Sequence, residues 1–133
     1  TFYQMDGMMV GEDVSAANYY ALIEEFLKNF FGKNIKTRMR PSFFPFTEPS
    51  FEIDFECLLC NSKGCSVCKQ SGWVEIIPGG MINQNVLVAA GYPRNKYQGC
   101  AWDIGISRLA MMKYKIDDIR LFQGGDLRFT KQF

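Results

Sequence analysis

The sequence contains no histidine. Its absence removes the commonest general base of enzymes and a frequent ligand of transition metals. Any catalysis by this chain must therefore use carboxylates, arginines, thiolates or the positioning of its substrates.

The net charge is also close to zero, and long apolar runs are absent from the sequence. Fifteen Lys and Arg residues stand against fourteen Asp and Glu residues, for a net charge of +1. The charge of the whole chain therefore favours neither a nucleic-acid surface nor a membrane surface. No segment has the pattern of a signal peptide, and no apolar run approaches the length of a membrane span. We expect a soluble, cytoplasmic protein with no membrane partner.

The chain also lacks an initiating methionine, and "TFYQMDGMMVG" opens in the middle of a strand-like pattern. We therefore expect a piece of a longer protein. At 133 residues, with 47% hydrophobic residues, the chain corresponds to a single partial domain with enough apolar material for a core.

The apolar spacing predicts helices placed on a mostly antiparallel sheet, an α+β fold. A helix is predicted over residues 16–31, capped by Ser15 and closed by Gly32. Strands are predicted over 2–10, 34–39, 49–57, 72–77 and 99–106. Pro41 is expected to end the second strand, and 78–84 to form a turn. Shorter helices are predicted over 85–91, 107–115, 116–122 and 126–133.

Four of the five cysteines fall within residues 57–68, as two pairs with CxxC spacing. Two such pairs supply the four sulfur ligands of a closed, structural zinc site, with Gly64 allowing a tight loop between them. The predicted zinc ligands are Cys57, Cys60, Cys65 and Cys68. The alternative is a hairpin tip whose cysteines are unmetallated or oxidised.

The segment "RMRPSFFPFTEP" combines two arginines with three phenylalanines and a glutamate. Prolines fix its backbone, so Phe44 and Phe46 are expected to project from the same face and to frame a flat apolar ligand. Plain core packing is the alternative. Farther along the chain, Arg108 is expected in the first turn of a helix, where it can reach a phosphate or stack on a base.

In this order, "FYQMDG", "RPSFFPFTEPS", "GCSVCKQSGWVEI", "GCAWDIGISRLAMMKYKIDDIRLF" and "DLRFTKQF" resemble the catalytic part of the bacterial phenylalanyl-tRNA synthetase α subunit. The resemblance implies a class II aminoacyl-tRNA synthetase-like antiparallel sheet flanked by helices, with a small four-cysteine zinc-knuckle insertion at about 57–68. It places residues 1–133 from the end of motif 2 through motif 3. It further implies the activation of L-phenylalanine with ATP and Mg²⁺, transfer to phenylalanine tRNA, and a β subunit in an (αβ)₂ assembly.

Positions that match the family's motifs take their expected roles from this resemblance. Gln4, Asp6 and Arg108 are implied as catalytic residues, with Gln4 and Asp6 at the amino group of phenylalanine. The resemblance also implies that Phe44, Phe46, Ala101 and Glu48 belong to the phenylalanine site. It implies that Phe2, Arg108 and Glu75 belong to the ATP site, where Phe2 and Arg108 would lie on either side of the adenine.

The chain departs from the motifs of the family at four positions. Tyr3 replaces a histidine, Asp6 a glutamate, Asp103 a glycine and Ser107 a glutamate. Motif 1 and the motif 2 arginine precede this segment in the family, so the isolated chain is not expected to form phenylalanyl adenylate. The alternatives are a non-catalytic synthetase-like paralogue that binds an amino acid, a nucleotide or a protein partner, and a zinc-stapled interaction module.

Overall fold

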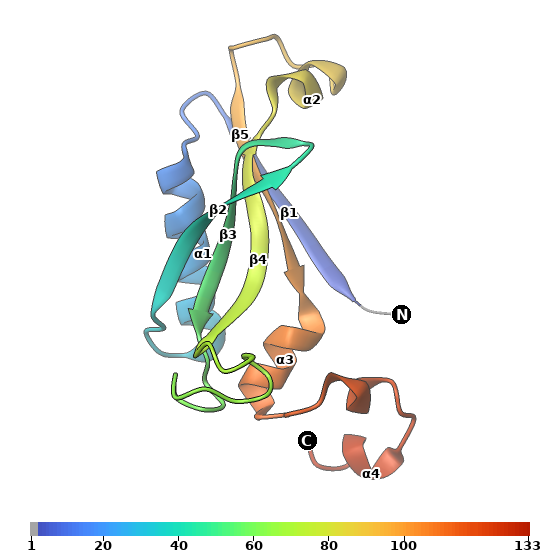
Figure 1. Ribbon diagram of the computed structural model, residues 1–133. Helices are drawn as coiled ribbons and strands as arrows, with labels where there is room; N and C mark the ends of the chain where they lie inside the picture. Colours follow the sequence, from blue (N-terminus) through green and yellow to red (C-terminus); the bar gives the residue numbers. More distant parts are fainter. Residues whose placement is uncertain (1–2) are drawn as a thin grey trace.

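The computed structural model describes residues 3–133 (Figure 1). Phe2, a predicted ATP-site residue, lies outside this part. In chain order the elements are β1 (Gln4–Gly11), α1 (Ala16–Phe31), β2 (Thr37–Phe44), β3 (Thr47–Glu56), β4 (Trp73–Ile82), α2 (Gln84–Ala89), β5 (Gln98–Gly105), α3 (Ile106–Tyr114), the 3-10 helix η1 (Ile119–Phe122) and α4 (Leu127–Thr130).

The strands form one five-stranded sheet with the order β1-β5-β4-β3-β2. All four neighbouring pairs are antiparallel. β1, the first strand in the chain, therefore pairs with β5, the last one, and β2 forms the opposite edge. The predicted α+β class with an antiparallel sheet is confirmed.

Helix α1 has the predicted bounds and the predicted caps. The Ser15 side chain and Asn18 form a reciprocal capping box, and Gly32 ends the helix in the left-handed conformation with φ 68°. Tyr19, Ile23 and Leu27, spaced on one helical face, are almost fully buried. They join the core together with the sheet side chains Ile53, Phe55, Ile77, Cys100 and Ile104.

Helix α1 covers one face of the sheet, and the other face carries no helix in the described part of the chain (Figure 1). α2 lies at one end of the sheet, whereas α3 and the loop of residues 57–72 between β3 and β4, here called the cysteine loop, lie at the opposite end. Side chains of a strand point to alternate faces of a sheet, but β3 and β4 also bury consecutive residues where their register shifts between Ile53 and Asp54. None of the described helices is both long and apolar enough to cross a membrane.

Two predictions about prolines and glycines are wrong. β2 runs through Pro41, which pairs with Phe51, because β2 is an edge strand and tolerates a missing N–H donor. The predicted turn at 78–84 is instead the second half of β4. Its Gly79 is required by close packing, since a Cβ there would lie 2.4 Å from the Ala101 carbonyl oxygen and 2.6 Å from the Tyr19 hydroxyl.

The C-terminal helices are shorter than the apolar spacing predicts. Only residues 119–122 and 127–130 are helical, each segment of four residues. Asp118 and Asp126 cap them by accepting hydrogen bonds from the backbone N–H groups of Arg120 and Arg128. Neither helix contains a buried residue, so packing does not extend them.

Candidate functional site

The open face of the sheet carries a cavity of about 530 Å³ between β1, β5, β4 and the turn after β2. We call it the aromatic cavity. The side chains of β1 and β5 that reach it face each other in register, with Asp6 opposite Asp103 and Met8 opposite Ala101. Its lining residues are Gln4, Asp6, Gly7, Met8, Phe44, Phe46, Pro78, Gly79, Ala101, Trp102 and Asp103.

Phe44 and Phe46 form one wall of the aromatic cavity. Their rings stack with centroids 6.4 Å apart and an interplanar angle of 15°. Phe46 lies in the turn and is 57% exposed, so core packing does not account for it. The Ser50 hydroxyl holds the turn, because it accepts a 3.1 Å hydrogen bond from the Phe44 N–H and lies 2.7 Å from the Thr47 hydroxyl. Two nearly parallel rings beside the methyl group of Ala101 make an apolar slot suited to a flat ring.

The other end of the aromatic cavity is polar. The Gln4 side-chain amide donates a hydrogen bond to Asp103 Oδ2. Asp103 Oδ1 is buried and has no hydrogen-bond partner in residues 3–133. Burial raises the pKa of Asp103, and the neighbouring Asp6 carboxylate raises it further. The carboxyl groups of Asp6 and Asp103 and the amide of Gln4 therefore gather acceptor oxygens at this end of the cavity.

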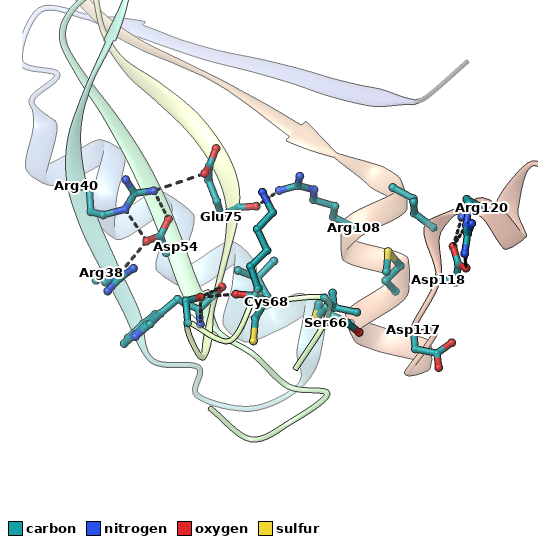
Figure 2. A pocket seen from close by; sticks show the side chains of 18 residues that line it. Arg38, Arg40, Asp54, Ser66, Cys68, Glu75, Arg108, Asp117, Asp118 and Arg120 are labelled. Atoms are coloured by element: carbon teal, nitrogen blue, oxygen red, sulfur yellow. Dashed lines mark hydrogen bonds and ion pairs between the residues drawn. The ribbon is translucent and has the colours of Figure 1, made fainter. Parts of the chain in front are cut away.

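A second cavity, of about 600 Å³, lies at the end of the same sheet next to α3 and the cysteine loop (Figure 2). We call it the charged cavity. Many of its lining residues are ionisable: Arg38, Arg40, Asp54, Cys68, Lys69, Glu75, Arg108, Asp117, Asp118 and Arg120. The sheet supplies Arg38, Arg40, Asp54 and Glu75, whereas Arg108 comes from α3.

Arg108 crosses from the first turn of α3 to β4. Its Nη1 donates a 2.6 Å hydrogen bond to the backbone carbonyl of Glu75, as Figure 2 shows. The Glu75 carboxylate lies 3.7 Å from Arg40 Nη2, a loose contact for an ion pair, and its side chain is 55% exposed. The guanidinium of Arg108 keeps further donors, and the Glu75 carboxylate keeps acceptor oxygens for a ligand.

Asp54 orders the arginines on the floor of the charged cavity. It accepts hydrogen bonds from Arg38 Nε at 2.8 Å and from Arg40 Nε at 2.7 Å. Arg40 also donates to Glu52 Oε2 at 2.8 Å. Burial alone would raise the pKa of Asp54, but the hydrogen bonds and charges of Arg40 and Arg38 outweigh it and lower this pKa below its usual value. Asp54 therefore remains ionised and holds both guanidinium groups against the sheet.

The cysteine loop between β3 and β4 brings its four sulfur atoms within 4.8 Å of one another. The Sγ–Sγ distances are 3.8 Å for Cys57–Cys65, 3.8 Å for Cys60–Cys68 and 3.6 Å for Cys65–Cys68. A tetrahedral site with Zn–S bonds of about 2.3 Å has S–S edges of about 3.8 Å. The four thiols could therefore hold a metal ion, and their arrangement fits a zinc knuckle.

Backbone N–H groups of the same loop point at its sulfur atoms. Gly64 donates to Cys60 Sγ at 3.3 Å, and Cys65 and Gly72 donate to Cys68 Sγ at 3.1 and 3.4 Å. Burial would raise the pKa of Cys68, but the N–H groups of Cys65 and Gly72 and the side chains of Cys65 and Cys60 lower it to about 7. The pKa of Cys57, by contrast, is raised by burial to about 12. The N–H groups stabilise the thiolate form that a metal ion requires.

The cysteine loop is also a wall of the charged cavity. Ser66, Val67, Cys68, Lys69 and Ser71 all line it. At the end of the loop, the Trp73 ring lies under the guanidinium of Arg38, with the Arg38 Cζ 4.5 Å from the ring centroid. The metal-binding arrangement and the charged cavity therefore share residues.

The structure brings most of the predicted site residues together. Gln4, Asp6, Phe44, Phe46 and Ala101 share the aromatic cavity. Glu75 and Arg108 share the charged one. Glu48, on β3, is exposed and lines neither cavity.

Sequence reasoning assigned no role to Arg38, Arg40 and Asp54, nor to Asp103 within the aromatic cavity. For the arginines a signal was present, because "TRMR" and "FEIDF" place two cations and two carboxylates at alternating positions of neighbouring strands. For Asp103 no local pattern revealed the contact, since its partners Gln4 and Asp6 lie at the other end of the chain.

Comparison with known proteins provides evidence that is independent of the cavities. The family model of the tRNA synthetases class II core domain (F) matches residues 1–133. A protein of Leptospira biflexa serovar Patoc (strain Patoc 1 / Ames) named phenylalanine–tRNA ligase alpha subunit is 55% identical over 133 residues, which are 100% of this chain and 39% of that protein.

Proteins of the same name from Francisella tularensis are also similar. Those of subsp. tularensis (strain WY96-3418) and of subsp. novicida (strain U112) are each 51% identical over 132 residues, or 99% of this chain. The chain spans 39% of the length of each of these relatives.

Proposed function

The chain belongs to the family of tRNA synthetases with a class II core domain, and on this premise we propose that it forms part of the α subunit of a phenylalanine–tRNA ligase. The complete enzyme would activate L-phenylalanine with ATP and transfer it to phenylalanine tRNA. Relatives that carry this name support the proposal, as do the two cavities on one face of the sheet.

The main support for this proposal is the shape and polarity of the aromatic cavity. Phe44 and Phe46 would enclose the phenyl ring of the substrate, and Ala101 would limit the depth of the slot. Gln4 and Asp6, at the polar end, would hold the ammonium group. An apolar slot joined to acceptors for one cation matches the two ends of phenylalanine.

The charged cavity would receive ATP. Arg108 would bind a phosphate or stack on the adenine, and Phe2 would pack on the other side of the base. Arg38 and Arg40, held by Asp54, add positive charge on the floor of the same cavity. Arginine side chains that are already in position when the reaction begins stabilise the charge that develops on the phosphates in the transition state.

In the activation step, a carboxylate oxygen of phenylalanine attacks the α-phosphorus of ATP. The new O–P bond forms as the bond to pyrophosphate breaks, so aminoacyl adenylate and pyrophosphate result. A terminal ribose hydroxyl of the tRNA then attacks the activated carbonyl, and AMP leaves. The attacking carboxylate is already ionised, so positioning and cationic stabilisation suffice for activation and the absence of histidine is no obstacle.

The residues present fit the two expected metal ions. Glu75 offers a carboxylate that is only loosely paired, which suits Mg²⁺ bound mainly by water and the phosphates of ATP. Mg²⁺ would there neutralise phosphate charge. Glu48 is a second acidic candidate from the family resemblance, although it lines neither cavity. Cys57, Cys60, Cys65 and Cys68 would hold a structural Zn²⁺, because all four ligand positions come from the protein.

As partners of the complete enzyme we propose a β subunit in an (αβ)₂ assembly and phenylalanine tRNA, and as its location the cytoplasm. The substrates of protein synthesis occur there. Cysteines in the free thiol form also suit a reducing compartment.

The test is phenylalanine-dependent ATP–pyrophosphate exchange by the full-length α chain assembled with its β partner. We expect exchange with phenylalanine and none with residues 1–133 alone. Absence of exchange and of phenylalanine binding in the assembled protein would contradict the proposed function. Exchange by the isolated segment would show that the proposed division of the active site is wrong.

A further inference from the structure

Asp6 and Asp103 are structural partners. The family resemblance implies a glutamate at the first of these positions and a glycine at the second. The two residues lie far apart in the sequence, but they are direct cross-strand neighbours on β1 and β5. Both line the polar end of the aromatic cavity. Asp6 is one methylene shorter than glutamate, and Asp103 adds a carboxylate beside it.

The Asp103 carboxylate is only half satisfied by the protein. Gln4 donates to its Oδ2, whereas Oδ1 is buried without a partner in residues 3–133. No lysine or arginine within that range forms an ion pair with Asp103 or Asp6. A buried carboxylate oxygen that lacks a donor is costly, so a ligand that brings a donor or a positive charge gains affinity here.

The rest of the aromatic cavity offers nothing else to neutralise this charge. Asp6 and Asp103 are the ionisable side chains among its lining residues, which are otherwise apolar or amide. Asp6 and Asp103 are cross-strand neighbours, and two carboxylates this close repel each other. Burial raises the pKa of Asp103, and the Asp6 charge raises it further. An ammonium group placed between them removes this repulsion and supplies up to three donors.

We propose that Asp103 is a second carboxylate acceptor for the ammonium group of the substrate, which is held between Gln4, Asp6 and Asp103. This inference rests on the proposed function and adds a residue to its amino-group subsite. Asp103 thereby strengthens the selection of aromatic ligands that carry an ammonium group over those that lack one.

The experiment compares two ligands on the complete synthetase. Phenylalanine and 3-phenylpropanoate, which lacks only the amino group, are titrated by calorimetry into the unmodified enzyme and into Asp103→Asn. We expect the affinity for phenylalanine to fall about tenfold or more and the affinity for 3-phenylpropanoate to stay the same or rise. In exchange kinetics, the KM for phenylalanine should rise while the KM for ATP stays unchanged.

Two further variants accompany this test. Asp103→Gly introduces the residue of the family pattern and should show the same ligand-selective loss, even if Asp103→Asn folds poorly. Asp13→Asn removes one negative charge from an exposed turn and should bind both ligands like the unmodified enzyme.

The titrations distinguish the role of Asp103 from the proposed function. Equal losses for both ligands, or unchanged phenylalanine affinity in the two Asp103 variants, would overturn the role of Asp103 and leave the proposed function standing. Failure of the unmodified enzyme to bind phenylalanine would overturn both.

Discussion

Arg40 and Asp54 form a two-pronged ion pair across the edge of the sheet. Arg40 Nε donates to Asp54 Oδ2 at 2.7 Å, and Arg40 Nη2 donates to Asp54 Oδ1 at 2.9 Å. Asp54 is 1% exposed, whereas the side chain of Arg40 is 39% exposed and faces the charged cavity. A buried carboxylate thus holds the Arg40 guanidinium in one orientation.

This pair predicts an acid-sensitive stability. The pKa of Asp54 is lowered in the folded chain, so its contribution is present above the ordinary aspartate value of about 3.9 and is lost as the pH falls through the lower folded-state value. We expect Asp54→Asn to lower the free energy of unfolding at neutral pH by about 3 kcal/mol, because two arginines lose their buried partner. The difference from the unmodified protein should shrink in acid.

Denaturant unfolding across this pH range measures the effect. Asp126→Asn is the matched control, since Asp126 pairs with Arg128 at 2.7 Å but on the surface. Its change should be much smaller. Equal effects of the two substitutions would contradict the importance of burial at Asp54.

Arg108→Ala should impair the use of ATP by the complete enzyme. The substitution removes a guanidinium from the charged cavity and its 2.6 Å bond to the Glu75 carbonyl. We expect kcat/KM for ATP in pyrophosphate exchange to fall about a hundredfold. Arg128→Ala, at an exposed arginine that does not line the charged cavity, should leave exchange unchanged. An unchanged kcat/KM in Arg108→Ala would exclude this arginine from the ATP site.

Phe46→Ala should raise the KM for phenylalanine about tenfold or more, because the ligand ring loses one wall of its slot. Phe43→Ala is the control. Phe43 is more exposed than Phe46, 77% against 57%, and does not line the aromatic cavity. Steady-state exchange kinetics on the complete enzyme compare the two, and equal effects would show that Phe46 acts only through general surface apolarity.

Cys60→Ser should remove bound zinc and lower the free energy of unfolding by about 3 kcal/mol or more. A weaker use of ATP should follow only as a consequence, since Lys69 and its neighbours line the charged cavity. Metal analysis and thermal unfolding measure both effects. Cys100→Ala, which alters the cysteine outside the loop, should keep its zinc. Loss of ligand binding with unchanged zinc content and thermal stability would show that the loop is not a structural clip.

Gly79→Ala should destabilise the fold by about 1–3 kcal/mol. The added Cβ would lie 2.4 Å from the Ala101 carbonyl oxygen and 2.6 Å from the Tyr19 hydroxyl, so α1 or β5 must shift. At Gly124 the nearest atom to an added Cβ is 3.7 Å away, and Gly124→Ala should be tolerated. Unfolding temperatures of the two variants are compared, and a neutral Gly79→Ala would mean that α1 packs less closely on β4 than the structure shows.

Local features were predictable from the sequence because they depend on neighbours along the chain. Ser15 and Gly32 mark the ends of α1 through their own hydrogen bonds and backbone conformation. The CxxC spacing brings pairs of sulfur atoms together within single turns. The roles of Phe44 and Arg108 came from a family resemblance instead, and the structure places both residues on a cavity wall.

The meaning of individual prolines and glycines was not predictable in the same way. Pro41 reads as a strand breaker, and it is tolerated only because β2 turned out to be an edge strand. The sequence predicts a turn at Gly79, but this glycine lies within β4, where Tyr19 and Ala101 pack too closely to leave room for a side chain. Each depends on which strand or helix lies beside it.

The ends of α1 and the grouping of four cysteines in one loop follow from the sequence alone. The pairing of Asp6 with Asp103 and the contact of Arg40 with the buried Asp54 come instead from the folding of the whole chain. The local pattern of a strand indicates which face a side chain takes, whereas its partner across the sheet depends on strand order and register. Those are set by the packing of the whole core against α1.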